Sequence, residues 1–129
     1  MDPIADMLVR IKNAQSAHKE TTAFGYSKIK WEIAKALEHA GYIAAVSKKG
    51  KKNRKLIEAG LIYDVQGAPK VLGLRRISSP GRRVYKGFRE IHSVKNGTGV
   101  ALYSTPKGVL LDKDARKEKV GGEILCEIW

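Results

Sequence analysis

Small polar side chains, glycines and a lysine gather in the last third of the chain, where their types and spacing suit contact with RNA. Ser104 and Thr105 precede a Pro-Lys-Gly turn, Pro106–Gly108, and Gly121-Gly122-Glu123 follows one short helix later. The minor groove of an RNA helix is wide and shallow and displays 2′-hydroxyls, which both donate and accept hydrogen bonds. Hydroxyls, exposed glycine backbone and the Lys107 ammonium can approach that surface without steric clash. These two segments therefore predict an RNA-contacting site.

Glu123 is an acid in a region that is expected to meet phosphates. A carboxylate beside RNA is costly unless it makes compensating hydrogen bonds. Glu123 could accept a hydrogen bond from a 2′-hydroxyl or an exocyclic amine, or it could order the neighbouring loop from behind. Both interpretations stay open at the level of the sequence, and a carboxylate that makes such bonds beside RNA suggests specific recognition.

The sequence offers little for catalysis or for metal binding. None of His18, His39 and His92 is spaced with Cys, His or a carboxylate as a metal ligand. Ser104 and Thr105 lie in no nucleophile elbow and have no base placed by spacing. No glycine-rich nucleotide-binding loop follows a predicted strand. We therefore expect no enzymatic activity, no metal and no cofactor.

Composition favours a compact protein with a polyanionic partner. The 129 residues are 43% hydrophobic, which suggests one unit or two small lobes. The formal net charge of +12 favours nucleic acid or an acidic membrane surface as the partner.

No apolar run is long enough for a membrane span, and the acidic start is unlike a signal peptide, so we expect a cytoplasmic protein. Cys126 is the only cysteine, so we expect no internal disulfide and a buried core thiol.

Positive charge is concentrated between Val65 and Leu111, where Glu90 is the only acid. A localised field guides docking, whereas a uniform charge mainly aids solubility. This belt therefore predicts RNA binding more strongly than the net charge does. Its basic residues are Lys70, Arg75, Arg76, Arg82, Arg83, Lys86, Arg89, Lys95 and Lys107.

The first half of the chain predicts two helices on a small sheet. Asp2 is expected to cap a helix that begins at Pro3. Ser27 is expected to cap a second helix, which ends before Gly41. Apolar runs and period-two alternation predict strands at 42–46, 57–64 and 71–77.

Two polar regions of this first half admit two interpretations each. Arg10, Lys12 and Asn13 share a helix with the apolar stripe, and they either contact phosphate or form a solvated face. The basic loop Lys48–Lys55 at a hairpin tip is either solvated or an RNA-contacting extension. The role of this loop stays open at this point.

The second half predicts a mostly β lobe. Ser78-Ser79-Pro80-Gly81 breaks a strand with proline and glycine, which indicates a joint. We therefore expect an α+β protein of two small lobes, an N-terminal α/β lobe at 1–78 and a mainly β, RNA-binding lobe at 79–129. Asp112 is expected to cap one short helix that runs to Lys119. Strands are predicted at 82–86, 100–104, 109–111 and 123–128.

These motifs resemble the bacterial small-subunit ribosomal protein eight family over essentially the whole chain. The family reads Ser-Thr-Ser-x-Gly, then apolar residues, a helix and Gly-Gly-Glu. The start, 2–13, the helix entry Ser27–Lys30 and the joint Ser79–Lys86 also resemble their family counterparts. The resemblance implies a structural constituent of the small ribosomal subunit that binds the central domain of small-subunit ribosomal RNA (rRNA), early in assembly and mainly through the C-terminal lobe.

The resemblance also implies partners and site residues. The partners are small-subunit rRNA, neighbouring small-subunit ribosomal proteins and a messenger RNA mimic from the chain's own operon, which the protein would repress. Residues expected to contact or frame RNA are Ser104, Thr105, Lys107, Gly108, Gly121, Gly122 and Glu123, with Tyr85, Lys86, Arg82, Arg10, Asn13 and Lys30 as further contacts.

Two departures from the family pattern matter. Pro106 stands where the second serine of the loop is usual, so one hydroxyl and one N–H are lost while the turn gains rigidity. Leu111 stands where a threonine is common, which passes the expected helix cap to Asp112.

The alternative function is a non-specific basic nucleic-acid-binding protein that acts through charge alone, and such a protein would bind RNA and DNA duplexes alike.

Overall fold

The computed structural model describes residues 2–129 as two compact units. One unit comprises Pro3–Leu72, and the other comprises Gly73–Trp129 together with Asp2. Helices packed on antiparallel strands in each unit confirm the α+β class. Whether the chain divides into independent domains at residues 78 and 79 stays a prediction.

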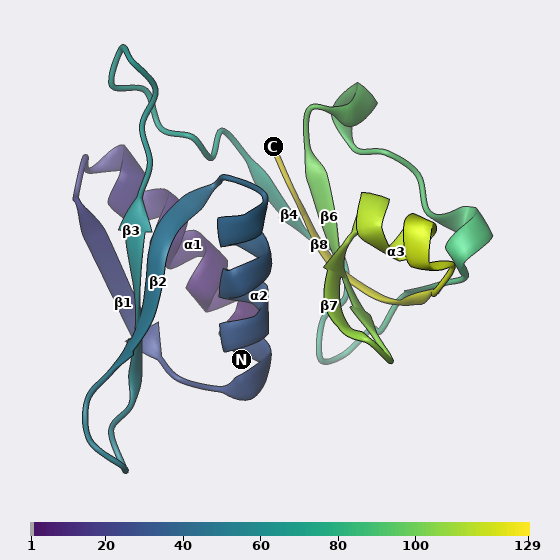
Figure 1. Cartoon of the computed structure of the whole chain (residues 1–129), viewed down its shortest axis with the longest axis horizontal. Coiled ribbons are helices and arrows are strands. Elements are labelled where there is room, and N and C mark those ends of the chain that lie inside the picture. The colour runs from purple at the N-terminus through teal and green to yellow at the C-terminus, as the bar shows by residue number, and fades with distance from the viewer. Residues whose placement is uncertain (1) are drawn as a thin grey trace. The chain divides into compact units, whose positions relative to one another are not determined.

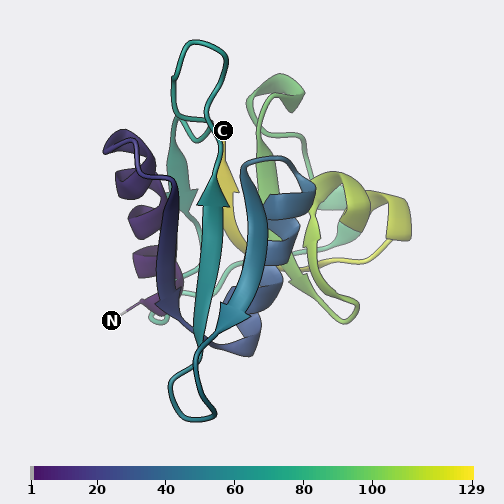
Figure 2. The same cartoon turned by 60° about the vertical axis from the view of Figure 1, so that its left-hand side comes forward.

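The N-terminal unit is a three-stranded antiparallel sheet in the order β1-β3-β2, with two helices on one face (Figures 1 and 2). The helices bury apolar stripes, which include Ile11 in the first and Ile33 and Leu37 in the second. On the sheet, Ile57 and Ala59 are fully buried. The elements are α1 (Pro3–Ser16), β1 (Thr21–Gly25), α2 (Lys28–His39), β2 (Ile43–Lys49) and β3 (Leu56–Leu61).

Local signals explain the helix boundaries of this unit. Ser27 occupies the N-cap of α2, and its side chain accepts a hydrogen bond from the Lys30 backbone N–H at 3.2 Å. Gly41 follows the C-cap with φ of +86°, a conformation that suits glycine. Both boundaries of α2 are confirmed, and Pro3 is confirmed as the first residue of α1.

The C-terminal unit is a five-stranded antiparallel sheet in which β8 is central. The order is β4-β8-β6-β7, and β5 pairs with another part of β8. Ala101, Tyr103 and Ile124 are buried in one core cluster with Ala115 of the single α-helix. The elements are β4 (Leu74–Arg76), β5 (Tyr85–Lys86), the 3₁₀ turns η1 (Phe88–Glu90) and η2 (Lys95–Gly97), β6 (Val100–Thr105), β7 (Gly108–Leu111), α3 (Asp112–Glu118) and β8 (Gly122–Ile128).

The structure adds one strand and corrects two predicted ones. Thr21–Gly25 forms β1, where no strand was predicted. The strand predicted at 71–77 to complete the first sheet is only Leu74–Arg76, and it pairs with β8. The strand predicted at 82–86 is only Tyr85–Lys86, because Ser79 and Arg82 pair with each other in a tight hairpin just before it.

Asp112 does not cap α3. The N-cap position is Leu111, and Asp112 is the first helical residue. The Asp112 carboxylate is buried, where Oδ1 accepts a hydrogen bond from the Ala101 N–H at 3.1 Å and Oδ2 accepts one from Arg116 at 3.4 Å. This acid therefore ties the helix to β6.

Candidate nucleic-acid interface

Strand register brings the two signature segments together at one end of the C-terminal sheet. Ser104 of β6 lies opposite Glu123 of β8, and Glu123 lies opposite Tyr85 of β5. Directly opposed residues project from the same face of a sheet, so these three side chains form one row. Their sequence neighbours Tyr103 and Ile124 are buried in the core cluster. The row therefore projects away from that core.

The neighbouring positions at this end of the sheet belong to the same candidate site, and we call the row and these positions together the signature row. Lys86 lies opposite Gly122, and Thr105 lies opposite Gly108 across the hairpin, so these positions alternate with the row and lie on the other face of the sheet. Tyr85 is 69% exposed, so the row opens to solvent at its β5 end. The signature row comprises Tyr85, Lys86, Ser104, Thr105, Lys107, Gly108, Gly122 and Glu123, with Gly121 at its border.

The Gly-Gly pair is required by backbone packing within the sheet. A Cβ on Gly121 would collide with the carbonyl oxygen of Lys86, and a Cβ on Gly122 would collide with that of Ser104. Both obstacles are backbone, which cannot move aside as a flexible side chain can. The glycines thus allow β8 to approach β5 and β6 closely, independently of any RNA contact.

Thr105 orders the Pro-Lys-Gly turn. Its Oγ1 donates a hydrogen bond to the Gly108 carbonyl at 2.8 Å and accepts one from the Lys107 N–H at 3.1 Å. Gly108 has φ of +100°, which favours glycine. The hydroxyl predicted to contact RNA is therefore engaged in holding the turn. Lys107 is exposed at the turn, and its ammonium lies 3.9 Å from Glu118.

Glu123 has a cationic partner in its own unit. Arg83 Nη1 donates a hydrogen bond to Glu123 Oε2 at 3.1 Å. The Glu123 side chain is 15% exposed, whereas the Arg83 side chain is 49% exposed. This pair supports the interpretation that Glu123 orders a neighbouring segment. It leaves Arg83 as the more accessible charged group.

A buried serine positions the segment that carries Arg82 and Arg83. Ser78 Oγ accepts a hydrogen bond from the Val84 N–H at 2.9 Å and donates one to the Val84 carbonyl at 3.2 Å. Ser79 and Arg82 exchange backbone hydrogen bonds at 2.9 and 3.1 Å. Neither Ser78 nor Arg83 was predicted as a site residue, although Arg83 lies in the basic belt.

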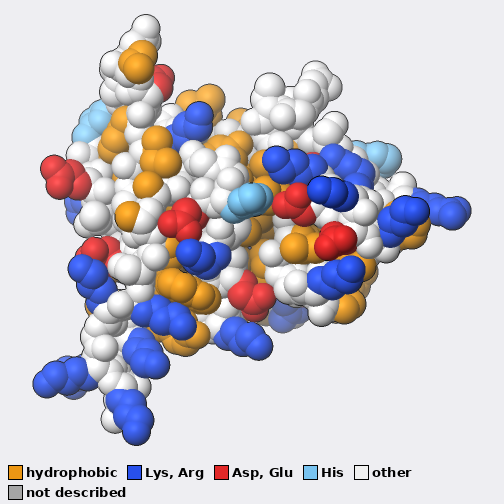
Figure 3. Space-filling view, viewed as in Figure 1, with side chains coloured by type: hydrophobic (Ala, Val, Ile, Leu, Met, Phe, Trp, Pro, Cys, Tyr) orange, Lys and Arg blue, Asp and Glu red, His pale blue; other side chains and the backbone are white. Residues whose placement is uncertain are grey.

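The N-terminal unit carries a separate concentration of positive charge. Lys and Arg side chains crowd the end of the β2–β3 hairpin (Figure 3). The basic loop is confirmed as a hairpin tip, because β2 and β3 pair up to Lys49 and Leu56. Lys30 lies in the first turn of α2 and is half-buried.

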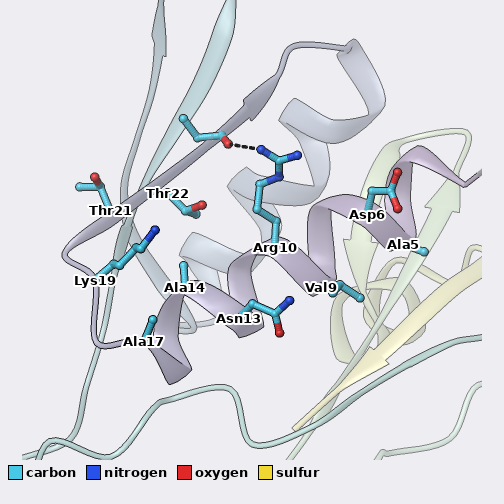
Figure 4. A pocket seen from close by; sticks show the side chains of 11 residues that line it. Ala5, Asp6, Val9, Arg10, Asn13, Ala14, Ala17, Lys19, Thr21 and Thr22 are labelled. Carbon is cyan, nitrogen blue, oxygen red and sulfur yellow. Dashed lines mark hydrogen bonds between the residues drawn. The ribbon is translucent and has the colours of Figure 1, made fainter.

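Arg10 and Asn13 line a groove between α1 and β1 (Figure 4). Arg10 Nη1 donates a hydrogen bond to the Ala23 carbonyl at 3.4 Å, so the guanidinium bridges the helix and the strand. Lys19 and Thr22 line the same groove. Arg10, Asn13 and Lys30 thus belong to the N-terminal unit, whereas the signature row belongs to the C-terminal unit.

Within residues 2–129, no cluster of three or more His, Cys, Asp or Glu side chains is arranged to hold a metal ion. Cys126 is buried as predicted, and burial raises the pKa of its thiol to about 12. Among the described helices, none is long and apolar enough to cross a membrane.

Comparison with known proteins gives a consistent result over the whole chain. The family model described as Ribosomal protein S8 matches residues 2–129. The chain is 48% identical to small ribosomal subunit protein uS8 of Persephonella marina, with 99% of this chain and 98% of the relative covered. It is 44% identical to the uS8 protein of Thermus aquaticus, with the same coverage of both chains. It is 46% identical to that of an Azoarcus species, with 97% and 95% covered.

Proposed function

The chain belongs to the ribosomal protein S8 family, and on this premise we propose that it is a primary binder of the central domain of small-subunit rRNA. Family membership makes it a structural constituent of the small ribosomal subunit, in the cytoplasm, and not an enzyme. The finer proposal concerns which RNA it binds, through which residues and with what consequence for assembly.

The observation that carries the proposal is the register of the signature row. Segments that are far apart in the sequence supply Tyr85, Ser104 and Glu123 to one row of one sheet. The row combines an exposed aromatic ring, hydroxyls and glycine backbone, flanked by Lys86 and Lys107. Such groups suit the 2′-hydroxyls and phosphates along an RNA minor groove. Charge attraction alone would not need the exposed Tyr85 ring or the Ser104 hydroxyl.

Different members of the row have different proposed roles. Tyr85, Lys86, Ser104 and Lys107 contact the RNA directly. Thr105, Gly108, Gly121 and Gly122 shape the backbone that presents them, and Glu123 holds Arg83 toward the RNA beside Arg82. Arg10, Asn13 and Lys30 stay further predicted contacts on the N-terminal unit.

We extend the proposal to assembly and regulation. A protein that recognises one helical region of the central domain organises that region early in subunit assembly, before neighbouring ribosomal proteins join. A messenger segment from its own operon that mimics the same RNA shape would compete for the same row. Excess protein would then repress its own synthesis. Competition between the rRNA stem and the operon leader for purified protein tests this extension.

The main proposal is tested by RNA footprinting of purified protein on whole small-subunit rRNA. We expect one protected helical region in the central domain, and binding of the corresponding stem-loop in preference to a DNA duplex of matched sequence. The double variant Tyr85→Ala/Ser104→Ala should weaken stem binding by about 1–3 kcal/mol for each lost contact.

The matched control is His92→Ala/Ser93→Ala, which alters two exposed residues of the same unit that are not members of the row. This variant should bind as the unaltered protein does. Equal loss in both variants, or equal affinity for RNA and DNA duplexes with a steep salt dependence, would contradict the proposal and support binding through charge alone.

A further inference from the structure

The β2–β3 hairpin of the N-terminal unit ends in a segment of unopposed positive charge. We define the basic tip as residues 50–55, which connect β2 to β3. Lys51, Lys52, Arg54 and Lys55 are all exposed. No acid occurs between Val46 and Lys55, and the next acid along the chain, Glu58, pairs with Lys49 at 3.2 Å.

The basic tip has a defined backbone turn. Gly50 has φ of +99°, and a Cβ at this position would collide with the carbonyl oxygen of Arg54. The Arg54 N–H donates a hydrogen bond to the Lys51 carbonyl at 2.8 Å. The four cations are therefore presented from a closed turn, not from an extended tail.

The two sides of the hairpin near its tip are held by Tyr26, which precedes α2, and by Trp31 of α2. The Tyr26 N–H donates a hydrogen bond to the Lys55 carbonyl at 3.1 Å. From the other strand, the Lys48 ammonium lies 5.0 Å from the centre of the Tyr26 ring and 4.7 Å from that of Trp31. Cation–π contacts at these distances are favourable. Lys48, Tyr26 and Trp31 thus form a clamp that holds the basic tip.

The contacts in the clamp also determine the role of the aromatic rings. Trp31 already faces two ammonium groups, those of Lys48 and of Lys35, the latter at 5.6 Å. A ring engaged in this way serves to hold the hairpin and is not free as a platform for base stacking. The tip itself has lysines and one arginine but no aromatic side chain. Its chemistry therefore suits backbone phosphates, which carry no sequence information.

We propose that the basic tip is a second RNA-docking surface, which binds phosphates of small-subunit rRNA outside the stem recognised by the signature row, and that Lys48 is its positioning residue. This inference rests on the proposed function, because it takes the same RNA as the polyanion. The basic loop then binds RNA, and the two units have different functions. The signature row selects the RNA, and the tip adds sequence-blind affinity.

Two charge-matched variants test the tip. Lys51→Gln/Lys52→Gln/Arg54→Gln/Lys55→Gln removes four positive charges from it, and Lys28→Gln/Lys113→Gln/Lys117→Gln/Lys119→Gln removes four exposed ones elsewhere. Each is titrated against whole small-subunit rRNA and against the minimal stem-loop at several salt concentrations. Four lost phosphate contacts lower the magnitude of the slope of log affinity against log salt by about 3.6, from ~0.9 per contact for a duplex.

We expect the tip variant to bind whole rRNA at least about tenfold more weakly than the control variant at moderate salt. On the minimal stem-loop the two variants should differ by less than about twofold. If they bind whole rRNA alike, the tip is not a docking surface, although specific binding by the signature row would stand. If the unaltered protein shows no preference for its stem, the proposed function itself fails.

The role of Lys48 is tested by comparing Lys48→Gln with Lys48→Arg, in the unaltered protein and in the neutralised-tip variant. A positioning role predicts several-fold weaker rRNA binding for Lys48→Gln when the tip is intact, retention of affinity by Lys48→Arg, and no effect of Lys48→Gln once the tip is neutral. An equal loss from Lys48→Gln in both backgrounds would overturn the positioning role, because it would mean that Lys48 contacts phosphate itself.

Discussion

Arg83 donates a hydrogen bond to Glu123 at 3.1 Å, so the acid of the Gly-Gly-Glu segment is neutralised within the protein. A carboxylate on an RNA-binding surface repels phosphate, and a paired one does so less. The pairing also restrains a long, half-exposed arginine that would otherwise sample many rotamers. We therefore interpret Glu123 as acting through Arg83.

A double-mutant cycle tests this interpretation. Arg83→Gln should weaken binding of the rRNA stem by about 1–3 kcal/mol, because a charge-assisted contact is lost. Glu123→Gln should weaken binding as well, but the double variant should cost little more than Arg83→Gln alone, with non-additivity above about 0.5 kcal/mol. Stem affinities from filter binding at one fixed salt concentration give the four values. Strict additivity would instead indicate that Glu123 contacts the RNA independently.

Gly122→Ala should damage the fold before it damages recognition. The new Cβ would collide with the Ser104 carbonyl oxygen, so β8 and β6 would have to separate. Overpacking of this kind costs about 1–3 kcal/mol. We expect a lower Tm in thermal unfolding together with weaker RNA binding. Gly81→Ala is the matched control, because a Cβ there meets no atom within 4 Å. An unchanged Tm for Gly122→Ala would show that the backbone packing tolerates a side chain.

The parts of the fold that local chemistry determines were predicted from the sequence. Helix α2 is an example, since Ser27 and Gly41 mark its ends by contacts within a few residues of each boundary. The hairpin that carries the basic tip and the burial of Cys126 were predicted from charge and alternation in the same way. Each of these features depends on short-range spacing.

The features that were missed depend on pairing between distant segments. Strand β1 lacks a strong alternating pattern and is defined by its pairing with β3, which lies much later in the chain. In this pairing Thr21 lies opposite Gly60. Asp112 resembled a cap by spacing, but its carboxylate bonds to the Ala101 N–H of a neighbouring strand. The Arg83–Glu123 pair likewise requires the β5–β8 register. Within the candidate site, residue types were predictable and partners were not.

Thr105 offers a way to separate turn ordering from direct contact. Thr105→Val keeps the shape of the side chain but loses the bonds to Gly108 and Lys107. We expect a loss of about 1–2 kcal/mol in the free energy of unfolding, measured by denaturant titration, and weaker stem binding. Thr105→Ser keeps the hydroxyl and should restore both. Weaker binding of Thr105→Val with an unchanged free energy of unfolding would instead indicate that the hydroxyl contacts RNA.

Stability at alkaline pH should depend on Tyr103, which is 1% exposed in the core of the C-terminal unit. Burial first, and then the negative charges of Asp112 and Glu127, raises the pKa of Tyr103 to about 12. In the unfolded chain a tyrosine titrates near 10. Between these values the folded state keeps a proton that the unfolded state releases, so the free energy of unfolding falls as the pH rises. The contribution is fully present below about pH 10 and is lost by about pH 12.

Tyr103→Phe removes the ionising group while keeping the ring. The difference between a pKa of about 10 and one of about 12 corresponds to roughly 2–3 kcal/mol. Between about pH 9.5 and pH 12, the free energy of unfolding of the variant should therefore fall by roughly 2–3 kcal/mol less than that of the unaltered protein. Denaturant titrations at closely spaced pH values measure the difference. Cys126, whose pKa burial also raises to about 12, contributes in the same direction in both proteins and cancels in the comparison. Parallel pH profiles for the two proteins would mean that Tyr103 ionises as easily in the fold as in the unfolded chain.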